Sequence, residues 1–300
     1  MTVDNSPVGK VIVPDVIAHR GFSAEYPENT MISYKKAIEA GTTALEGDIR
    51  ITKDGEVIMM HDLSLNRTTT GSGNVIDCNW YGDIENLTTK VGQEPIPRLV
   101  DVLDLLSSSQ VVEKNMCMII DIKFNNPLDI LDAVHKLVRQ YPSTLKKQLV
   151  IGIWNREFLA EAQRLFEGFQ LCFIGLSLRS ARAHFLHTTD AISVPFITLA
   201  NDDGQAYIKE AHSLNKRVFS WTINDVGEME KCTSWGIDGV VGDNTPLLLK
   251  HVHENIKHLS SEEFEAFVES QKYPLATSEL IYNMLKTFVM DVISSIYIRA

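Results

Sequence analysis

The sequence has few cysteines, and they are far apart. Four occur among its 300 residues, at Cys78, Cys117, Cys172 and Cys232. No pair has a CxxC or zinc-like spacing, which argues against a disulfide framework and against a structural zinc site. We therefore expect free buried thiols, as in proteins of reducing compartments.

Long apolar runs are also lacking. The first segment, Met1 to Pro14, is polar and has no apolar core of the kind that a secretory signal needs. The chain nowhere reaches the roughly 18 uninterrupted apolar residues of a membrane-spanning helix. We expect an intracellular protein, either cytoplasmic or peripheral on an intracellular membrane.

Positive charge is scarce. The chain has 28 Lys and Arg against 39 Asp and Glu, a formal net charge of −11. Nucleic acids are bound through clustered Lys and Arg, so we expect no nucleic-acid partner. The same deficit disfavours adsorption to anionic lipid by bulk charge, although a local patch could override it. With 44% hydrophobic and 22% charged residues, the composition is that of a soluble globular protein with a sizeable core.

Short apolar runs alternate with amphipathic helical segments along most of the chain. Apart from one hairpin strand, we count eight strand–helix units in about 240 residues, which is the size of a (β/α)8 TIM barrel. Strands that are apolar on both faces indicate an all-parallel sheet. An open doubly wound sheet is the alternative, but it usually has fewer units and a Gly-rich phosphate loop, which is absent here.

The predicted barrel spans residues 15–257, after an N-terminal lead of residues 1–14. A small insertion at about 54–98 follows the second strand, Ala44 to Thr52, and begins with a hairpin signal, Asp54-Gly55. The rest of the insertion has no clear period. Its larger apolar residues would need cover. They are Ile76, Trp80, Tyr81, Ile84 and Leu87.

The last segment, residues 258–300, departs from the alternation. Apolar pairs recur every fourth residue from Leu280 to Tyr297, and Lys286 and Asp291 interrupt them, which argues against a bilayer span. We interpret this extension as an amphipathic helix packed on the barrel or on a second subunit. The alternative is an interfacial helix that makes peripheral membrane contact through 278–298.

Three carboxylates stand near the ends of neighbouring predicted strands. Glu46 and Asp48 are two residues apart and therefore face the same side of the second strand. Asp121 and Lys123 repeat this spacing at the end of the third strand. Oxygen ligands from the three carboxylates would suit Mg²⁺ or Ca²⁺. A buried salt-bridge network with Lys123 and Arg50 is the alternative.

Two histidines are expected at the same end of the barrel. His19 ends the first strand, and His61 follows the hairpin that returns from the second. Two imidazoles on opposite sides of a phosphorus would serve as general base and general acid in an in-line displacement. Arg20 and Lys123 would bind phosphate oxygens, which the metal would polarise. The other histidines lie in predicted helices or their flanks and are interpreted as surface residues.

Several short motifs occur in a distinctive order and spacing. They are His19-Arg20-Gly21, Pro27-Glu28-Asn29-Thr30, Glu46-x-Asp48, Asp54-Gly55, His61-Asp62, Arg67-Thr68-Thr69-x-Gly71-x-Gly73, Trp221-Thr222-Ile223-Asn224 and Gly236-Ile237-Asp238-Gly239. Over about Val16 to Leu249, this combination resembles the glycerophosphodiester phosphodiesterase family.

The resemblance implies a TIM barrel with a small insertion after the second strand, dependence on a divalent metal, and hydrolysis of a phosphodiester that carries a glycerol group. It also implies the roles of individual residues. By position, His19 and His61 would be an acid/base pair, and Glu46, Asp48 and Asp121 would be metal ligands. Arg20 and Lys123 would contact the phosphate, and Trp221 would form a wall of the substrate pocket.

Two positions depart from the family pattern. The family usually has Glu where this chain has Asp121, so the carboxylate is one methylene shorter. Ile153-Trp154-Asn155 stands where the family often has a Ser-Phe-Asp-like triplet. The Asp-Ile-Lys variant with a C-terminal apolar extension is similar to the fungal branch that acts as a phospholipase C on phosphatidylglycerol.

The leading expectation is therefore a metal-dependent phospholipase C that cleaves phosphatidylglycerol to diacylglycerol and glycerol phosphate. The alternative is a soluble glycerophosphodiester phosphodiesterase that releases glycerol 3-phosphate and an alcohol. A third hypothesis, an inactive lipid-binding barrel, is disfavoured by the intact set of His19, His61, Glu46 and Asp48.

Overall fold

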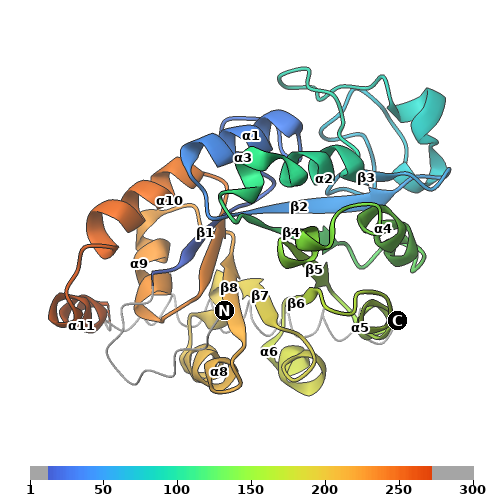
Figure 1. The fold of residues 1–300 in the computed structure, drawn as a ribbon. Helices are drawn as coiled ribbons and strands as arrows, with labels where there is room; N and C mark the ends of the chain where they lie inside the picture. Colours follow the sequence, from blue (N-terminus) through green and yellow to red (C-terminus); the bar gives the residue numbers. More distant parts are fainter. Residues whose placement is uncertain (1–12, 272–300) are drawn as a thin grey trace.

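Eight parallel strands close into a barrel in the computed structural model, which describes residues 13–271. The strands, which form the inner ring of Figure 1, are β1 (Asp15–Ala18), β2 (Ala44–Ile51), β4 (Cys117–Ile122), β5 (Leu149–Ile153), β6 (Gln170–Ile174), β7 (Ala191–Pro195), β8 (Arg217–Trp221) and β9 (Gly239–Gly242). The ring closes because β1 pairs in parallel with both β2 and β9. The predicted TIM barrel is confirmed.

Helices surround the barrel on its outside (Figure 1). They are α1 (Met31–Ala40), α2 (Leu99–Ser107), α3 (Ser109–Val112), α4 (Ile130–Val138), α5 (Arg156–Leu165), α6 (Leu178–Ser180), α7 (Phe196–Leu199), α8 (Asp202–Ser213), α9 (Val226–Ser234), α10 (Thr245–His251) and α11 (Ser261–Ser270). Short helical turns add η1 (Val75–Asp77), η2 (Trp80–Ile84), η3 (Ser143–Lys147), η4 (Ala181–Phe185) and η5 (Val252–Ile256).

The core has two layers, as the strand pattern predicts. The larger layer fills the space between the sheet and the helices and includes Leu45 and Ile49 of β2. A smaller cluster fills the barrel interior, with Ile17, Ile119 and Val241 among its members. Side chains alternate between these layers along each strand, so Glu46 and Asp48 point inward.

The insertion has a small core of its own. The strand β3 (Val57–Met59) returns antiparallel along β2, as the Asp-Gly turn predicts. Trp80 and Ile84 are buried in this core, as expected. The same expectation is wrong for Ile76 and Tyr81, which are 43% and 59% exposed, because the core closes on residues from β3 and the following loops instead.

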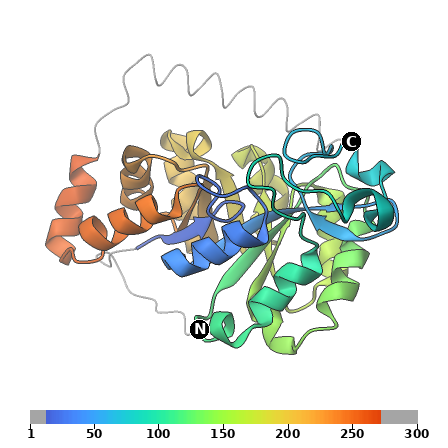
Figure 2. The ribbon, with the colours of Figure 1, turned by 90° about the horizontal axis from the view of Figure 1, so that it is seen from above.

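The helix α11 lies on the opposite side of the molecule from the insertion (Figure 2). Ser260 caps it and forms a capping box with Glu263. Within residues 13–271, no helix has both the length and the apolarity required to cross a membrane. The predicted apolar stripe from Leu280 to Tyr297 lies outside the described residues.

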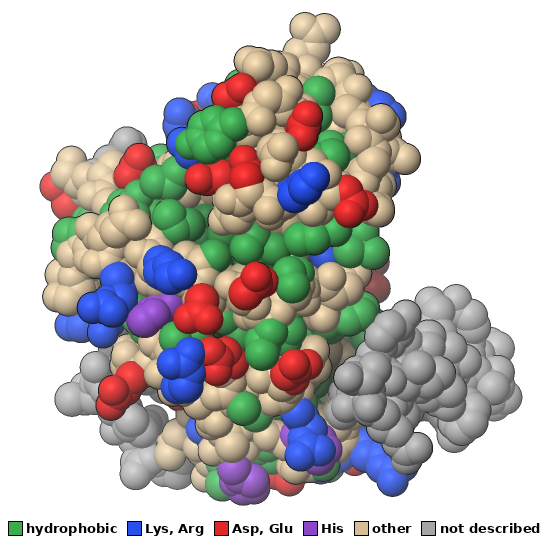
Figure 3. Space-filling model, turned by 90° about the vertical axis from the view of Figure 1, so that its right-hand side faces the viewer, with side chains coloured by type: hydrophobic (Ala, Val, Ile, Leu, Met, Phe, Trp, Pro, Cys, Tyr) green, Lys and Arg blue, Asp and Glu red, His purple; other side chains and the backbone are tan. Residues whose placement is uncertain are grey.

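Charges of both signs are mixed on the surface. On the face seen in Figure 3, acidic and basic side chains are interspersed with apolar ones. A separate cluster of charged side chains lies inside the barrel mouth.

Candidate active site

A cavity of about 150 Å³ opens at the carboxyl ends of the barrel strands. This is the end at which TIM-barrel proteins place their functional residues. Its polar wall contains His19, Arg20, Glu46, His61, Asp121 and Lys123. Its apolar wall contains Ile119, Trp154, Ile174, Trp221 and Val241.

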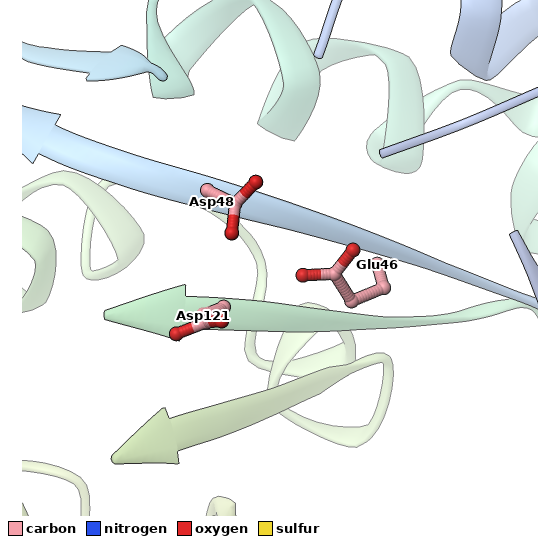
Figure 4. A group of neighbouring side chains, drawn as sticks. All are labelled: Glu46, Asp48 and Asp121. Carbon is pink, nitrogen blue, oxygen red and sulfur yellow. The ribbon is translucent and has the colours of Figure 1, made fainter. Parts of the chain in front are cut away.

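Three buried carboxylates form one group at this end of the barrel (Figure 4). Glu46 and Asp48 come from β2, and Asp121 comes from the neighbouring β4, where it is the register partner of Asp48. One ligand oxygen from each of the three residues lies within 4.8 Å of the others. The structure therefore brings together the three residues that the sequence selects as metal ligands.

The residue between the two β2 carboxylates has to be small. Gly47 faces the helices, and a Cβ atom added there would clash with the hydroxyl of buried Tyr34. That hydroxyl donates to Asn29 Oδ1 at 2.9 Å. Asn29 in turn donates through Nδ2 to Asp48 Oδ2 at 2.8 Å and accepts from the Asp48 backbone N–H at 3.1 Å. The helix-side packing of β2 thus fixes the carboxylate on its inner side.

Two cations lie among the carboxylates. Lys123 Nζ is 2.6 Å from Asp121 Oδ2 and 2.7 Å from Asp48 Oδ1. Arg20 Nε is 3.2 Å from Asp48 Oδ2, and the Arg20 backbone N–H donates to Glu46 Oε2 at 2.9 Å. A salt-bridge network around Lys123 therefore exists. Arg50 is not part of it, because its guanidinium binds the carbonyl of His61 and the side chain of Asn125.

The carboxylate group fits a divalent cation. Three carboxylates face two basic side chains, and burial together with the charge of Asp48 raises the pKa of Glu46 to about 7. The ionised form of Glu46 is thus disfavoured first by burial and then by the neighbouring carboxylate, and a bound cation would favour that form. Carboxylate oxygens are the ligands that hard divalent cations prefer. When bound, such a cation would be held by Glu46, Asp48 and Asp121.

His19 is held by a carboxylate that follows β9. Its Nδ1 lies 2.6 Å from Asp243 Oδ1, and Ser23 and Asn224 donate to the same carboxylate. Burial lowers the pKa of His19, but the hydrogen bond to Asp243 and the charge of Glu46 outweigh it, so the pKa is raised. The carboxylate acceptor fixes the proton on Nδ1 and leaves Nε2 for chemistry.

His61 has a similar partner but an opposite shift. Its Nδ1 lies 2.7 Å from Asp62 Oδ1. Burial lowers the pKa of His61, and the charges of Lys123 and Arg20 lower it further, against the effect of Asp48. The pKa values of the two imidazoles are therefore shifted in opposite directions within one cavity.

Arg67, from the insertion, links two carboxylates that contact residues of the cavity lining. Its guanidinium donates to both oxygens of Asp62, at 2.6 and 2.9 Å, and to both oxygens of Glu28, each at 2.8 Å. Glu28 also accepts from Arg20 Nη1 at 2.9 Å. Arg67 is thus connected to His61 through Asp62 and to Arg20 through Glu28.

Aromatic rings line the other side of the cavity. Trp154 and Trp221 contact each other edge to face, with ring centroids 6.1 Å apart. The indole N–H of Trp154 donates to Asp121 Oδ1 at 2.6 Å. The indole nitrogen of Trp221 is buried and has no hydrogen-bond partner among the described residues.

All the predicted site residues meet in one place. His19, Arg20, Glu46, His61, Asp121, Lys123 and Trp221 line the cavity, and Asp48 lies within the carboxylate group. Their chemical roles stay predictions. Sequence reasoning missed Asp243, Asn29 and the Glu28–Arg67 pair as parts of the site. Asp243 directly follows a barrel strand, so the strand-end rule could have found it.

One interpretation of the remaining histidines is wrong. His251 is only 4% exposed, and its Nδ1 lies 2.9 Å from the side-chain amide of Asn255. It lies at the end of α10 and packs inward, so it is not a surface residue.

Comparison with known proteins agrees with this geometry. Residues 19–247 match the Glycerophosphoryl diester phosphodiesterase family, which is more than half of the chain. A glycerophosphodiester phosphodiesterase of Caldanaerobacter subterraneus is 28% identical over 251 residues, covering 80% of this chain and 98% of that protein. Another, from Bacillus subtilis, is 27% identical over 263 residues, covering 77% of this chain and 85% of that protein.

Solved structures share the fold. A phosphodiesterase from Oleispira antarctica, in complex with the product sn-glycerol-3-phosphate, has a TM-score of 0.71 at 23% identity and covers 81% of this chain and 98% of its own. A glycerophosphodiester phosphodiesterase from Thermotoga maritima has a TM-score of 0.64 at 24% identity, with 79% and 97% covered. The chain therefore belongs to the glycerophosphoryl diester phosphodiesterase family and is a phosphoric diester hydrolase.

Proposed function

We propose that this protein hydrolyses glycerophosphodiesters in the described cavity, releasing glycerol 3-phosphate and an alcohol. The observation that carries the proposal is the joint placement of His19, His61 and the three buried carboxylates around one cavity. The name of the Caldanaerobacter relative and the product bound to the Oleispira enzyme support the same substrate class.

We further propose that Glu46, Asp48 and Asp121 hold Mg²⁺ or Ca²⁺. A cation held there would polarise the phosphate and offset the charge that develops on its oxygens. Arg20 and Lys123 lie beside the same carboxylates, so both cationic groups can bind and orient a phosphodiester there. A phosphate oxygen would take the place of part of their present contact with Asp48.

His61 is the general base and His19 the general acid in this proposal. The lowered pKa of His61 keeps its Nε2 free to accept a proton from the attacking water as its oxygen bonds to phosphorus. The raised pKa of His19 keeps a proton on its Nε2 for the leaving alkoxide. Oppositely shifted groups on one substrate are the usual basis of an acid/base assignment.

The apolar wall binds the carbon skeleton of the substrate. Ile119, Ile174, Val241 and Trp221 are part of this wall. The unpartnered indole N–H of Trp221 can donate to a glycerol or phosphate oxygen. This division into a charged half and an apolar half orients the diester across the two histidines.

Phosphatidylglycerol is the lipid member of the same substrate class. The names of the relatives support the deacylated substrate, and the segment predicted to contact a membrane lies outside the described residues. The two substrates are separated by one assay. Full-length protein is given glycerophosphoglycerol in solution and phosphatidylglycerol in vesicles, and the release of glycerol phosphate is measured. We expect kcat/KM for glycerophosphoglycerol to exceed that for phosphatidylglycerol. A higher kcat/KM for phosphatidylglycerol would instead establish phospholipase C activity.

A further inference from the structure

Asp121 has both of its carboxylate oxygens occupied by donors from its own chain. Lys123 Nζ lies 2.6 Å from Oδ2, and the Trp154 indole N–H donates to Oδ1, also at 2.6 Å. The carboxylate is 4% exposed, so these donors determine its orientation. The two places at which the sequence departs from the family pattern, Asp121 and Trp154, are therefore in direct contact.

Packing, rather than Asp121 alone, sets the position of Trp154. It directly follows β5, whose Gly152 is the register partner of Asp121. Its ring contacts those of Phe124 and Trp221, at centroid distances of 5.9 and 6.1 Å. A ring packed against two others has little freedom to turn, so it can impose an orientation on the carboxylate.

We propose that Trp154 is a positioning residue for the cation site, fixing Asp121 so that this short carboxylate faces Glu46 and Asp48. The inference rests on the proposed function, because it assumes that the three carboxylates hold a divalent cation. A carboxylate oxygen has two lone pairs, so Oδ1 can accept the indole N–H and still serve as a ligand.

The indole also prevents a competing arrangement. Without it, the Asp121 carboxylate is free to turn toward Lys123, whose ammonium is its other partner. An aspartate reaches less far than a glutamate, so a rotation that a longer side chain could absorb would remove it from the site. Groups that orient metal ligands are typically worth 10- to 100-fold in metal affinity.

Calorimetric titration of the full-length protein with Ca²⁺ and with Mg²⁺ tests the inference. Trp154→Phe keeps the aromatic ring and removes the N–H, and we expect it to weaken binding by roughly 10- to 100-fold. The matched control is Trp235→Phe, whose ring stacks on Phe196 away from the cavity and whose replacement should leave affinity unchanged. Unchanged affinity in Trp154→Phe would overturn the proposal.

A second pair of variants separates positioning from general damage. In an Asp121→Glu background the longer side chain can reach the site unaided, so adding Trp154→Phe should weaken binding less than about 3-fold, far below the penalty expected in the native background. An equal penalty in both backgrounds would refute the positioning role. Asp121→Asn tests the cation site itself: if it leaves affinity unchanged, the proposed function fails, and not only this inference.

One measurement needs no variant with a perturbed fold. The chain has four tryptophans, so ¹⁵N-tryptophan labelling gives four indole signals. Titration of the native protein with Ca²⁺ should shift the Trp154 indole signal, because its acceptor becomes a ligand, and leave that of Trp235 in place. A Trp154 signal that stays unmoved while Ca²⁺ binds would contradict the proposal.

Discussion

At the scale of single residues, the site depends on identical side chains being placed in different surroundings. His19 and His61 each have a carboxylate on Nδ1, yet the pKa of His19 is raised and that of His61 is lowered. Burial lowers the pKa of both rings. At His19 the hydrogen bond to Asp243 and the charge of Glu46 outweigh it. At His61 burial, helped by Lys123 and Arg20, outweighs the charge of Asp48. The surroundings of each ring therefore shift its pKa in opposite directions, which is the basis of the proposed acid and base roles.

The first residue-scale prediction concerns the acid. Replacing His19 by Ala should lower kcat on a soluble glycerophosphodiester by roughly 10²–10⁴-fold, the usual contribution of an acid/base group. The control is His253→Ala, an exposed histidine of η5, which should keep the native rate. Near-native turnover in His19→Ala would remove this residue from the mechanism.

The second concerns pH. An acid must be protonated, so activity falls as pH rises through the pKa of His19. Asp243 raises that pKa through its hydrogen bond. Asp243→Asn therefore lowers it, and the alkaline limb of the kcat profile should move to lower pH while the acidic limb stays. A shift of the acidic limb alone would reverse the assignment of the two histidines.

Sequence reasoning finds residues at strand ends but not the pairs they form. His19, Asp121 and Lys123 were predicted because each ends an apolar run. The bond between His19 and Asp243 joins positions 224 residues apart, and only closure of the ring brings them together. The hydrogen bond between Trp154 and Asp121 could not be predicted from the sequence either, because it depends on the rotamers of both side chains.

At the scale of elements, β2 is the central one. Its two carboxylates point into the barrel, and Gly47 faces the helices. The strand β3 pairs with its C-terminal part. The alternation along β2 was predictable from the sequence. The need for glycine at position 47 was not, because it comes from Tyr34 on α1.

This packing gives an element-scale prediction. Gly47→Ala forces a methyl group against the Tyr34 hydroxyl and should destabilise the protein by about 1–3 kcal/mol, the typical cost of overpacking. Urea denaturation measures the change. In a Tyr34→Phe background the closest contact, at the hydroxyl, is removed and only flexible methionine ends remain, so the same substitution should cost less. Equal costs in the two backgrounds would show that Tyr34 is not the obstacle.

The insertion yields another prediction. Arg67→Ala removes the link between Asp62 and Glu28, so His61 and Arg20 both lose an indirect support. Because small displacements of reacting groups are costly, kcat/KM should fall by up to roughly 10²-fold. Arg164→Ala on α5 breaks an exposed ion pair with Glu161 and serves as the control. Equal activity in the two variants would show that the Arg67 link is not needed for catalysis.

At the scale of the whole molecule, repetition makes the fold predictable. Eight successive strand–helix units commonly form a closed parallel barrel, and this chain does so. Ile76 and Tyr81 were misplaced because the insertion has no period from which burial can be read. The barrel brings the ends of β1, β2, β4 and β5 to one mouth, and the chemistry depends on that convergence.

The central claim is that a divalent cation at this mouth is required for phosphodiester hydrolysis. It is tested most directly by measuring glycerol phosphate release from glycerophosphoglycerol by the full-length protein, first in EDTA and then after adding Mg²⁺ or Ca²⁺ in excess. The account predicts no release in EDTA and recovery with at least one cation. Full activity in EDTA, or none under any of these conditions, would contradict it.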